Sequence, residues 1–302
     1  MTDPLVSGPG IVVVDKPRGP SSHQVAAWVG EILGTDVGHA GTLDPQVSGV
    51  LVVMLGRAAR LARLLLRHDK EYVCVLRLHA DVDEARVREV AAEFVGRLYQ
   101  RPPRRSAVKR QLRIRRIHAL DVLEVRGRLV LFTVRCEAGT YIRSLCHHLG
   151  LVMGCGGQMA ELRRTRSGTF GEADAVTLHA LKDAAVRAAE GDRAGLDRMV
   201  LAVEAAIPDL KAIVIGDRAV DAVCHGAVLA GVGVLELPQF RAGETVALVT
   251  QKGELVALAR TLVESASTAP GRPGLVAAPE TVFMAPGTYA RGWKAKEQTN
   301  PP

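Results

Sequence analysis

Apolar residues in the first two thirds of the chain recur at two spacings, one typical of helices and one typical of strands. Ser21 and Gln24 form a capping-box pattern, apolar residues follow at helical spacing, and Gly34 ends the predicted helix. Further helices are predicted over 57–67, 83–98, 140–153 and, as a pair, 178–203. Strands are predicted over 12–14, 71–79, 112–136 (two or three strands) and 161–170. Because helices and strands do not alternate regularly, the pattern favours an α+β layer fold.

The pattern changes near Pro208, and from Lys211 onward it consists of short strands. These are predicted over 212–215, 232–237, 246–250, 255–260 and 282–284. Short, closely spaced strands are typical of a small β-barrel. We therefore predict a first domain over 1–208, a small barrel-like domain over 209–293 and a flexible tail over 294–302.

Composition narrows the class of protein. With 48% hydrophobic residues in 302, the chain can form well-packed cores. No apolar run approaches the roughly 18 residues of a membrane span, and the first residues lack the pattern of a signal peptide. The five cysteines are scattered, without a C-x-x-C pair or zinc-finger spacing to histidine. We expect a cytosolic protein with no membrane partner and no bound metal.

The positive charge is concentrated in the first domain. The net charge is +7, with 39 lysines and arginines against 32 acidic residues. Residues 209–291 hold seven basic and eight acidic side chains, so the excess lies almost wholly in 1–208. The run 101–118 contains eight lysines and arginines and no acid. Charge runs commonly form solvated faces, but this one favours a phosphate-rich partner.

A candidate catalytic loop lies within 38–51, where glycines and hydroxyl residues surround one carboxylate, Asp44. Pro45 restricts Asp44 to an extended backbone, while Gly41 and Gly49 permit conformations or close approaches that other residues resist. The sequence therefore predicts a stiff loop that presents Asp44. An aspartate that bonds its own backbone in a turn is the commoner use of such a residue, and the residues alone leave this alternative open.

This loop resembles the catalytic motif of pseudouridine synthases, in the branch that contains the bacterial enzyme for tRNA position 55 and the dyskerins. Asp44 falls on the nucleophilic aspartate of that motif. Further segments resemble other motifs of the family in the same order, namely 15–23, 70–73, 138–145 and 162–168. The departures are modest: Ser21 replaces a usual threonine, and His68-Asp69 replaces a step that contains glycine.

The resemblance implies a role for each candidate residue of the site. Lys16 and Pro17 would support the loop, Arg143 would pair with Asp44, and Tyr72 would stack on the target base or transfer a proton. Tyr141, Leu162 and His39 would line the pocket. Taken alone, each of these side chains is more simply explained by packing, and only its place in a motif indicates function.

The resemblance also covers the rest of the chain. Residues 101–110 and 144–148 favour the dyskerin branch, and 211–293 resemble the PUA domain, a small RNA-binding β-barrel. The implied fold is a mixed β-sheet flanked by helices, followed by that barrel. The implied activity is conversion of uridine to pseudouridine in RNA, at tRNA position 55 and at guide-directed rRNA sites, as catalytic subunit of an H/ACA particle with small accessory proteins. No cofactor is required, because the reaction has no redox change and no group donor.

We expect the basic residues of the first domain to contact RNA phosphates. They are Arg101, Arg104, Arg105, Lys109, Arg110, Arg163, Arg164 and Arg166. Two other hypotheses remain. The chain could be a non-catalytic RNA-binding scaffold of a ribonucleoprotein particle. It could also be an enzyme of small phosphorylated metabolites, although it lacks the glycine-rich phosphate-binding signatures.

Overall fold

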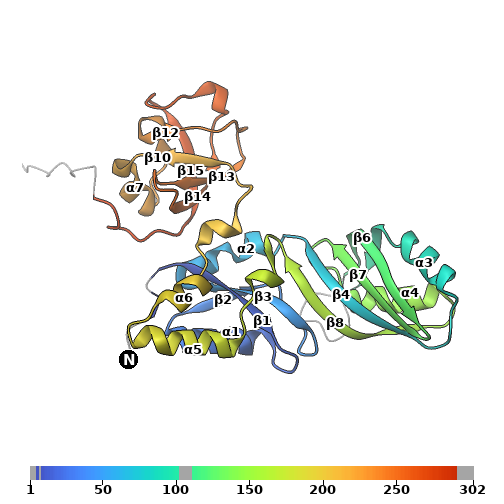
Figure 1. Ribbon diagram of the computed structural model, residues 1–302. Helices are drawn as coiled ribbons and strands as arrows, with labels where there is room; N and C mark the ends of the chain where they lie inside the picture. Colours follow the sequence, from blue (N-terminus) through green and yellow to red (C-terminus); the bar gives the residue numbers. More distant parts are fainter. Residues whose placement is uncertain (1–4, 7, 102–110, 291–302) are drawn as a thin grey trace, which may run out of the picture. The chain divides into compact units, whose positions relative to one another are not determined.

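The computed structural model describes residues 5–6, 8–101 and 111–290. These residues belong to two compact units, Met1–Leu201 and Ala202–Pro302, each with a hydrophobic core (Figure 1). The predicted tail, 294–302, lies outside the described residues, and so does half of the predicted basic run, 102–110. Within the described ranges, no helix is long and apolar enough to cross a membrane.

The first unit is built on a nine-stranded sheet of mixed direction. The main path runs β1 (Gly10–Lys16), β3 (Ser48–Leu55), β8 (Gly157–Ser167), β4 (Lys70–Leu78), β7 (Leu129–Cys136), β6 (Arg113–Arg126) and β5 (Gly96–Gln100). Two short strands, β2 (Val37–Ala40) and β9 (Phe170–Gly171), pair with β3 and β8. β3 and β8 run parallel with Gly49 opposite Arg164, which joins the two halves of the sheet at the candidate loop.

Helices cover the two halves of this sheet separately (Figure 1). One core forms where α1 (Ser22–Leu33), α5 (Leu178–Ala189) and α6 (Ala194–Met199) pack against β1 and β3. The other forms where α3 (Glu84–Glu93) and α4 (Ile142–Val152) pack against β4, β6 and β7. Leu43 and Val47, which flank Asp44, are buried in the second core. The loop is therefore anchored by the burial of apolar side chains on both sides of the carboxylate.

The predicted helices of the first unit are partly confirmed. The capping box of Ser21 and Gln24 is present, and Gly34 ends α1 in the left-handed conformation. The predicted helix 57–67 is a 3₁₀ helix, Gly56–Leu61, followed by the short α2, Ala62–Leu65. The predicted helix 83–98 is wrong beyond Glu93. At Gly96 the backbone has φ of +124°, and the chain continues as β5, whose pairing with β6 outweighs the local helical spacing.

The second unit contains a six-stranded sheet covered by α7 (Asp217–Cys224). Its strands follow the order β11 (Leu229–Ala230), β15 (Leu275–Val282), β14 (Leu255–Thr261), β13 (Thr245–Val249), β10 (Ala212–Ile215) and β12 (Val234–Glu236). The predicted strand 282–284 is wrong, because β15 ends at Val282. Phe283 and Met284 are buried beyond the strand, and Pro279 inside β15 hid it from the sequence pattern. The predicted α+β class is confirmed.

Candidate active site

The loop that carries Asp44 connects β2 to β3 and is shaped by two glycines. Gly41 and Gly49 have φ of +80° and +100°, in the region that side chains rarely adopt. A Cβ atom at Gly49 would lie 2.2 Å from the carbonyl oxygen of Arg164 and 2.8 Å from its backbone nitrogen. Glycine is thus required at position 49 by conformation and by the close approach of β8.

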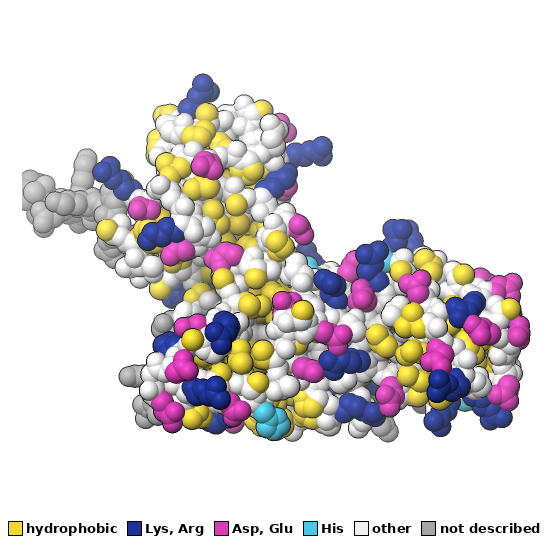
Figure 2. Space-filling model, viewed as in Figure 1, with side chains coloured by type: hydrophobic (Ala, Val, Ile, Leu, Met, Phe, Trp, Pro, Cys, Tyr) yellow, Lys and Arg dark blue, Asp and Glu magenta, His cyan; other side chains and the backbone are white. Residues whose placement is uncertain are grey.

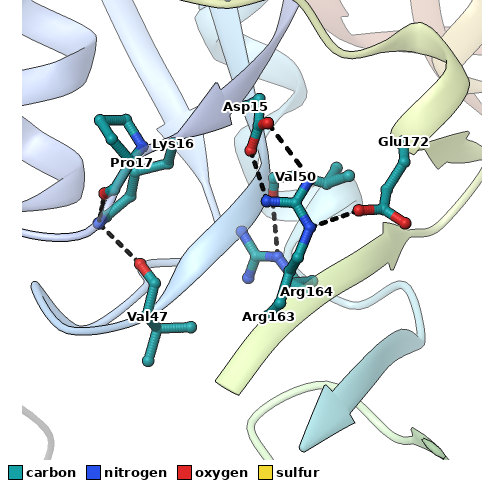
Figure 3. Close-up of polar contacts among 8 residues, drawn as sticks. All are labelled: Asp15, Lys16, Pro17, Val47, Val50, Arg163, Arg164 and Glu172. Carbon is teal, nitrogen blue, oxygen red and sulfur yellow. Dashed lines mark hydrogen bonds and ion pairs between the residues drawn. The ribbon is translucent and has the colours of Figure 1, made fainter. Parts of the chain in front are cut away.

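Lys16 supports the second half of this loop. Its side chain is fully buried at the end of β1, and its Nζ donates to three carbonyl oxygens, those of Pro17 (2.7 Å), Val47 (2.8 Å) and Pro45 (3.3 Å). Figure 3 shows the first two contacts. A buried ammonium group with three acceptors is well satisfied. The contacts agree with the support predicted for Lys16, and Pro17 takes part through its carbonyl group.

Ser22, the first residue of α1, supports the first half of the loop. Its buried Oγ accepts a hydrogen bond from the backbone nitrogen of Leu43 (2.8 Å) and donates to the carbonyl oxygen of the same residue (3.0 Å). The backbone nitrogen of Val47 donates to the carbonyl oxygen of Asp44 (2.9 Å), which closes a turn. The carboxylate of Asp44 therefore extends from a backbone segment that hydrogen bonds fix on both sides of this residue.

Asp44 and Arg143 form an ion pair between this loop and α4. Both side chains reach solvent, with 54% of Asp44 and 47% of Arg143 exposed. Arg143 is the second residue of α4, where its charge opposes the helix dipole. The carboxylate of Asp44 offsets that unfavourable position. The structure thus brings together the two side chains predicted to pair, and it leaves the carboxylate open to a substrate.

Tyr72 lies on β4 with its side chain 8% exposed, opposite Arg164 of β8. Burial raises the pKa of Tyr72 above its usual value, while the positive charge of Arg164 counters this rise. The charge of Asp44 adds to the increase in the pKa of Tyr72, which places the two groups within electrostatic reach. Tyr72 is therefore a neutral phenol at physiological pH, able to donate a hydrogen bond or present its ring.

The other predicted pocket residues lie on α4, β8 and β2 or next to them. Tyr141 precedes α4, and the amide of buried Gln100 brackets its backbone: Tyr141 N donates to Oε1 (3.0 Å), and Nε2 donates to Tyr141 O (3.2 Å). Leu162 is half-buried against the second core. His39 is half-buried on β2, and burial, followed by His23 and Arg164, lowers its pKa. Gln100, the last residue of β5, was not identified from the sequence, since a single glutamine next to a basic run gives no periodic signal.

The predicted RNA-contacting residues have different surroundings. Arg101 and Arg166 are exposed. Arg163 is bound to Asp15 (2.9 Å) and Glu172 (2.5 Å), as Figure 3 shows. Arg104, Arg105, Lys109 and Arg110 lie outside the described residues. On the face drawn in Figure 2, basic side chains of the first unit are interspersed with acidic ones rather than gathered in one field.

Arg164 requires a correction, because it is 1% exposed and does not present its guanidinium to a surface phosphate. Its Nε donates to the carbonyl oxygen of Val50 (2.7 Å), and its Nη2 donates to that of Gly41 (2.8 Å). The basic composition of the segment suggested a solvated residue. Strand alternation was the better signal, since it places Arg164 on the same face as the pocket residue Leu162.

Lys70 is a third buried cation beside Lys16 and Arg164, and its pattern in the sequence did not single it out. It is 5% exposed, and its Nζ donates to the carbonyl oxygens of His68 (2.6 Å) and Leu65 (3.3 Å). Burial, reinforced by the charge of Arg164, lowers the pKa of Lys70 to about 8. Burial and Arg164 also lower the pKa of Lys16, whereas Asp44 opposes that shift. Lys16, Lys70 and Arg164 form a group beneath the loop that we call the buried cations.

No group of three or more histidine, cysteine or acidic side chains that could hold a metal ion occurs in the part of the chain that the structure describes. All five cysteines are free thiols. Cys74 and Cys146 are buried in mutual contact, with 3.5 Å between their sulfur atoms.

Comparison with known proteins places the whole chain in one group. Its residues 31–142 match the TruB family pseudouridylate synthase (N terminal domain), 143–208 the tRNA pseudouridylate synthase B C-terminal domain, and 211–281 the PUA domain. A curated relative from Methanosarcina barkeri, named "Probable tRNA pseudouridine synthase B", is 50% identical over 95% of this chain and 86% of its own length. One of the same name from Methanothermobacter thermautotrophicus is 50% identical over 94% and 89%.

Solved structures show the same likeness. An H/ACA RNP bound to a substrate RNA containing 2'-deoxyuridine includes a chain that matches with a TM-score of 0.85 and 43% identity, over 94% of this chain and 88% of the other. A Cbf5-Nop10-Gar1 complex matches with a TM-score of 0.82 and 46% identity, over 91% and 85%. The similarity extends through both units.

Proposed function

The chain belongs to the TruB family of pseudouridylate synthases, and from this membership we propose that Asp44 is the catalytic carboxylate of an enzyme that isomerises uridine within RNA. The observation that carries the proposal is the pairing of Asp44 with Arg143 at a solvent-open position, within electrostatic reach of Tyr72. A carboxylate that acts on a sugar has to be both ionised and accessible. The ion pair holds the carboxylate beside a guanidinium, and the exposed position leaves room for a nucleotide.

The reaction breaks the bond between N1 of uracil and C1′ of ribose, turns the base and forms a bond from C5 to C1′. The proton at C5 is lost and N1 gains one, so atoms and electrons balance without an oxidant or a group donor. Asp44 acts on the sugar, either by attack on C1′ or by removal of a sugar proton. Neither route calls for a cofactor.

Arg143 and Tyr72 serve the same event in different ways. Arg143 stabilises the negative charge of Asp44 until the substrate arrives. Tyr72 stacks on a uracil that has been flipped out of the folded RNA, and as a neutral phenol it can also donate a proton. Tyr141, Leu162 and His39 form the remainder of the pocket. Arg101 and Arg166 are exposed basic residues that can contact the phosphates beside the target uridine.

The RNA substrates that we propose are tRNA, at position 55, and rRNA at sites chosen by a guide RNA. The names of the relatives support the first substrate, and the likeness to chains in H/ACA and Cbf5-Nop10-Gar1 assemblies supports the second. We propose that the chain is the catalytic subunit of such a particle, with small accessory proteins as partners. We also propose a cytoplasmic location, where free thiols such as those of this chain persist.

The Asp44→Asn variant separates this enzyme from a non-catalytic scaffold. The amide keeps the size of the side chain but cannot act as a nucleophile or base, so turnover should fall by about a thousandfold or more. The measurement is release of tritium from uridine labelled at C5, in a tRNA transcript and in rRNA fragments with guide RNA and accessory proteins. RNA affinity should stay within about twofold of wild type, because phosphate contacts dominate affinity.

Asp121→Asn is the matched control, since Asp121 is an exposed aspartate on β6 of the same unit. It should turn over at the wild-type rate. If Asp44→Asn also retained that rate, the proposed role of Asp44 would be wrong. Absence of turnover in the wild-type protein itself, with RNA binding intact, would support the scaffold hypothesis.

A further inference from the structure

Arg164 lies at the junction of three strands next to the site. On β8 it is opposite Gly49 of β3 on one side and Tyr72 of β4 on the other. Its side chain crosses beneath the loop, where Nε donates to the carbonyl oxygen of Val50 and Nη2 to that of Gly41 (Figure 3 draws the first contact). These two carbonyl groups stand at the two ends of the segment 41–50, which holds Asp44 and includes the first three residues of β3. One planar group therefore fixes the distance between those ends.

The same guanidinium acts on the tyrosine of the pocket. Arg164 lies directly opposite Tyr72 in the pairing of β8 with β4, and its charge counters the rise in the pKa of Tyr72. Asp44 and Tyr72 come from separate segments of the chain, and these contacts connect both of them to one rigid side chain. A guanidinium suits this task because its donors are spread over a rigid plane, whereas the three donors of an ammonium group share one nitrogen on a flexible stem.

The surroundings of Arg164 make the burial of its charge energetically unfavourable. It is 1% exposed, and in the described part of the chain no carboxylate forms a salt bridge with it. Lys16 and Lys70, both buried, lie close enough for its charge to disfavour theirs. Removing a cation from water costs several kcal/mol, and an apolar side chain could fill the same volume at lower cost. The carbonyl contacts compensate for part of this penalty, and a positioning role explains why a charge is kept here.

We propose that Arg164 is a positioning residue for pseudouridine formation, which holds both ends of the loop from Gly41 to Val50 and orients Tyr72. It does not touch the substrate, and it acts through Asp44 and Tyr72. Together with Lys16 and Lys70 it places positive charge beneath the loop, on the side opposite the incoming RNA. This inference rests on the proposed function of Asp44.

The test compares Arg164→Met and Arg164→Lys with wild type at saturating tRNA. Methionine fills much of the space without donors, so kcat should fall about a hundredfold, as displacement of reacting groups by about 1 Å can cause. Lysine restores the charge and one donor and should recover part of that loss. The Kd for RNA should stay within about twofold, because the side chain does not reach the surface. A wild-type kcat in Arg164→Met, or a loss confined to RNA affinity, would overturn the proposal.

Arg77→Met is the matched control, since Arg77 is an exposed arginine on β4, the strand that carries Tyr72. It should leave kcat unchanged. If Arg164→Met does not fold, Arg164→Lys is combined with Tyr72→Phe in a double-mutant cycle. A shared role predicts that the two losses in kcat are not additive, while purely additive losses would contradict the link between Arg164 and Tyr72.

The outcomes also separate this inference from the function on which it rests. If Asp44→Asn abolishes turnover and Arg164→Met does not reduce it, only the positioning role fails. If Asp44→Asn remains active, the proposed function fails first, whatever Arg164 does.

Discussion

Lys70 shows how a single buried side chain can make the stability of this protein depend on pH. Its ammonium group donates to two carbonyl oxygens but is shielded from water and lies near Arg164. Burial lowers the pKa of Lys70 from 10.5 to about 8 in the folded protein, while the unfolded chain keeps the ordinary value. The two states therefore bind different numbers of protons between those pH values.

We predict a pH-dependent difference between wild type and Lys70→Met. Below pH 8 the lysine is protonated in both states, so the difference in their free energies of unfolding is constant. Between pH 8 and 10.5 the folded wild type releases a proton that its unfolded chain retains, and its stability rises relative to Lys70→Met by about 3 kcal/mol in total. Urea denaturation at several pH values measures the change. Parallel stability curves for the two proteins would contradict it.

At the scale of single residues, the sequence indicated which side chains to consider for the site, but not which of the charged ones are buried. The motif resemblance identified Asp44, Arg143 and Tyr72, and the structure places these side chains in one neighbourhood. It grouped Arg164 with surface arginines and passed over Lys70, because burial of a cation depends on strands that are distant in sequence. Only the alternation along β8 carried a local signal for Arg164.

Among the elements, the parallel pair of β3 and β8 is the one on which the site depends. Its close contact requires glycine at position 49, where any side chain would collide with the backbone of Arg164. The pair brings the end of the Asp44 loop against the strand that carries Leu162 and Arg164. No regular crossover between these strands is visible in the sequence, so their pairing could not be predicted from spacing.

Gly49→Ala should therefore lower the free energy of unfolding by at least about 2 kcal/mol, from the positive φ together with the collision. Turnover should fall as well, because β3 can relieve the collision only by moving the loop.

Gly127→Ala is the control, because Gly127 also has a positive φ, of +55°, but open space around it. The free energy of unfolding should fall by about 1 kcal/mol, without loss of turnover. Thermal unfolding and tritium release provide the two measurements. Equal losses of stability in the two variants would show that the contact with Arg164 is not tight.

Element boundaries show why local pattern has limits. The helical spacing of 83–98 continued through Phe94 and Val95, yet pairing with β6 extended the chain from Gly96. In the second unit Pro279 concealed β15, although the strand accommodates it. By contrast α1 was predicted closely, because its capping box and final glycine are local signals that the fold retains. Predictions held where the determining contacts were near in sequence.

On the scale of the whole molecule, charge is divided unequally along the chain. The excess of basic residues lies almost wholly in 1–208, while 209–291 are close to neutral. The described arginines of the first unit are partly used internally, as Arg163 and Arg164 show. Phosphate binding must then depend on those basic residues that are not engaged within the protein. In the run 101–118 Arg115 is paired with Glu137, so the basic residues over 101–110 are the strongest candidates, in a segment that contains no acid.

We predict that neutralising Arg104, Arg105 and Lys109 together to glutamine weakens RNA binding and flattens its dependence on salt. Each lost phosphate contact lowers the slope of log K against log salt by about 0.7–0.9, so the triple change should lower it by about 2. Titration of a labelled tRNA between low and moderate salt gives the slope.

The control changes Arg86, Arg126 and Arg128 to glutamine. These exposed arginines are paired with carboxylates, and their replacement removes the same total charge. If both triple variants change the slope equally, net charge attracts the RNA. If only the first does, the basic run itself contacts the RNA backbone, and the near-neutral second unit is left to recognise the shape or sequence of the RNA.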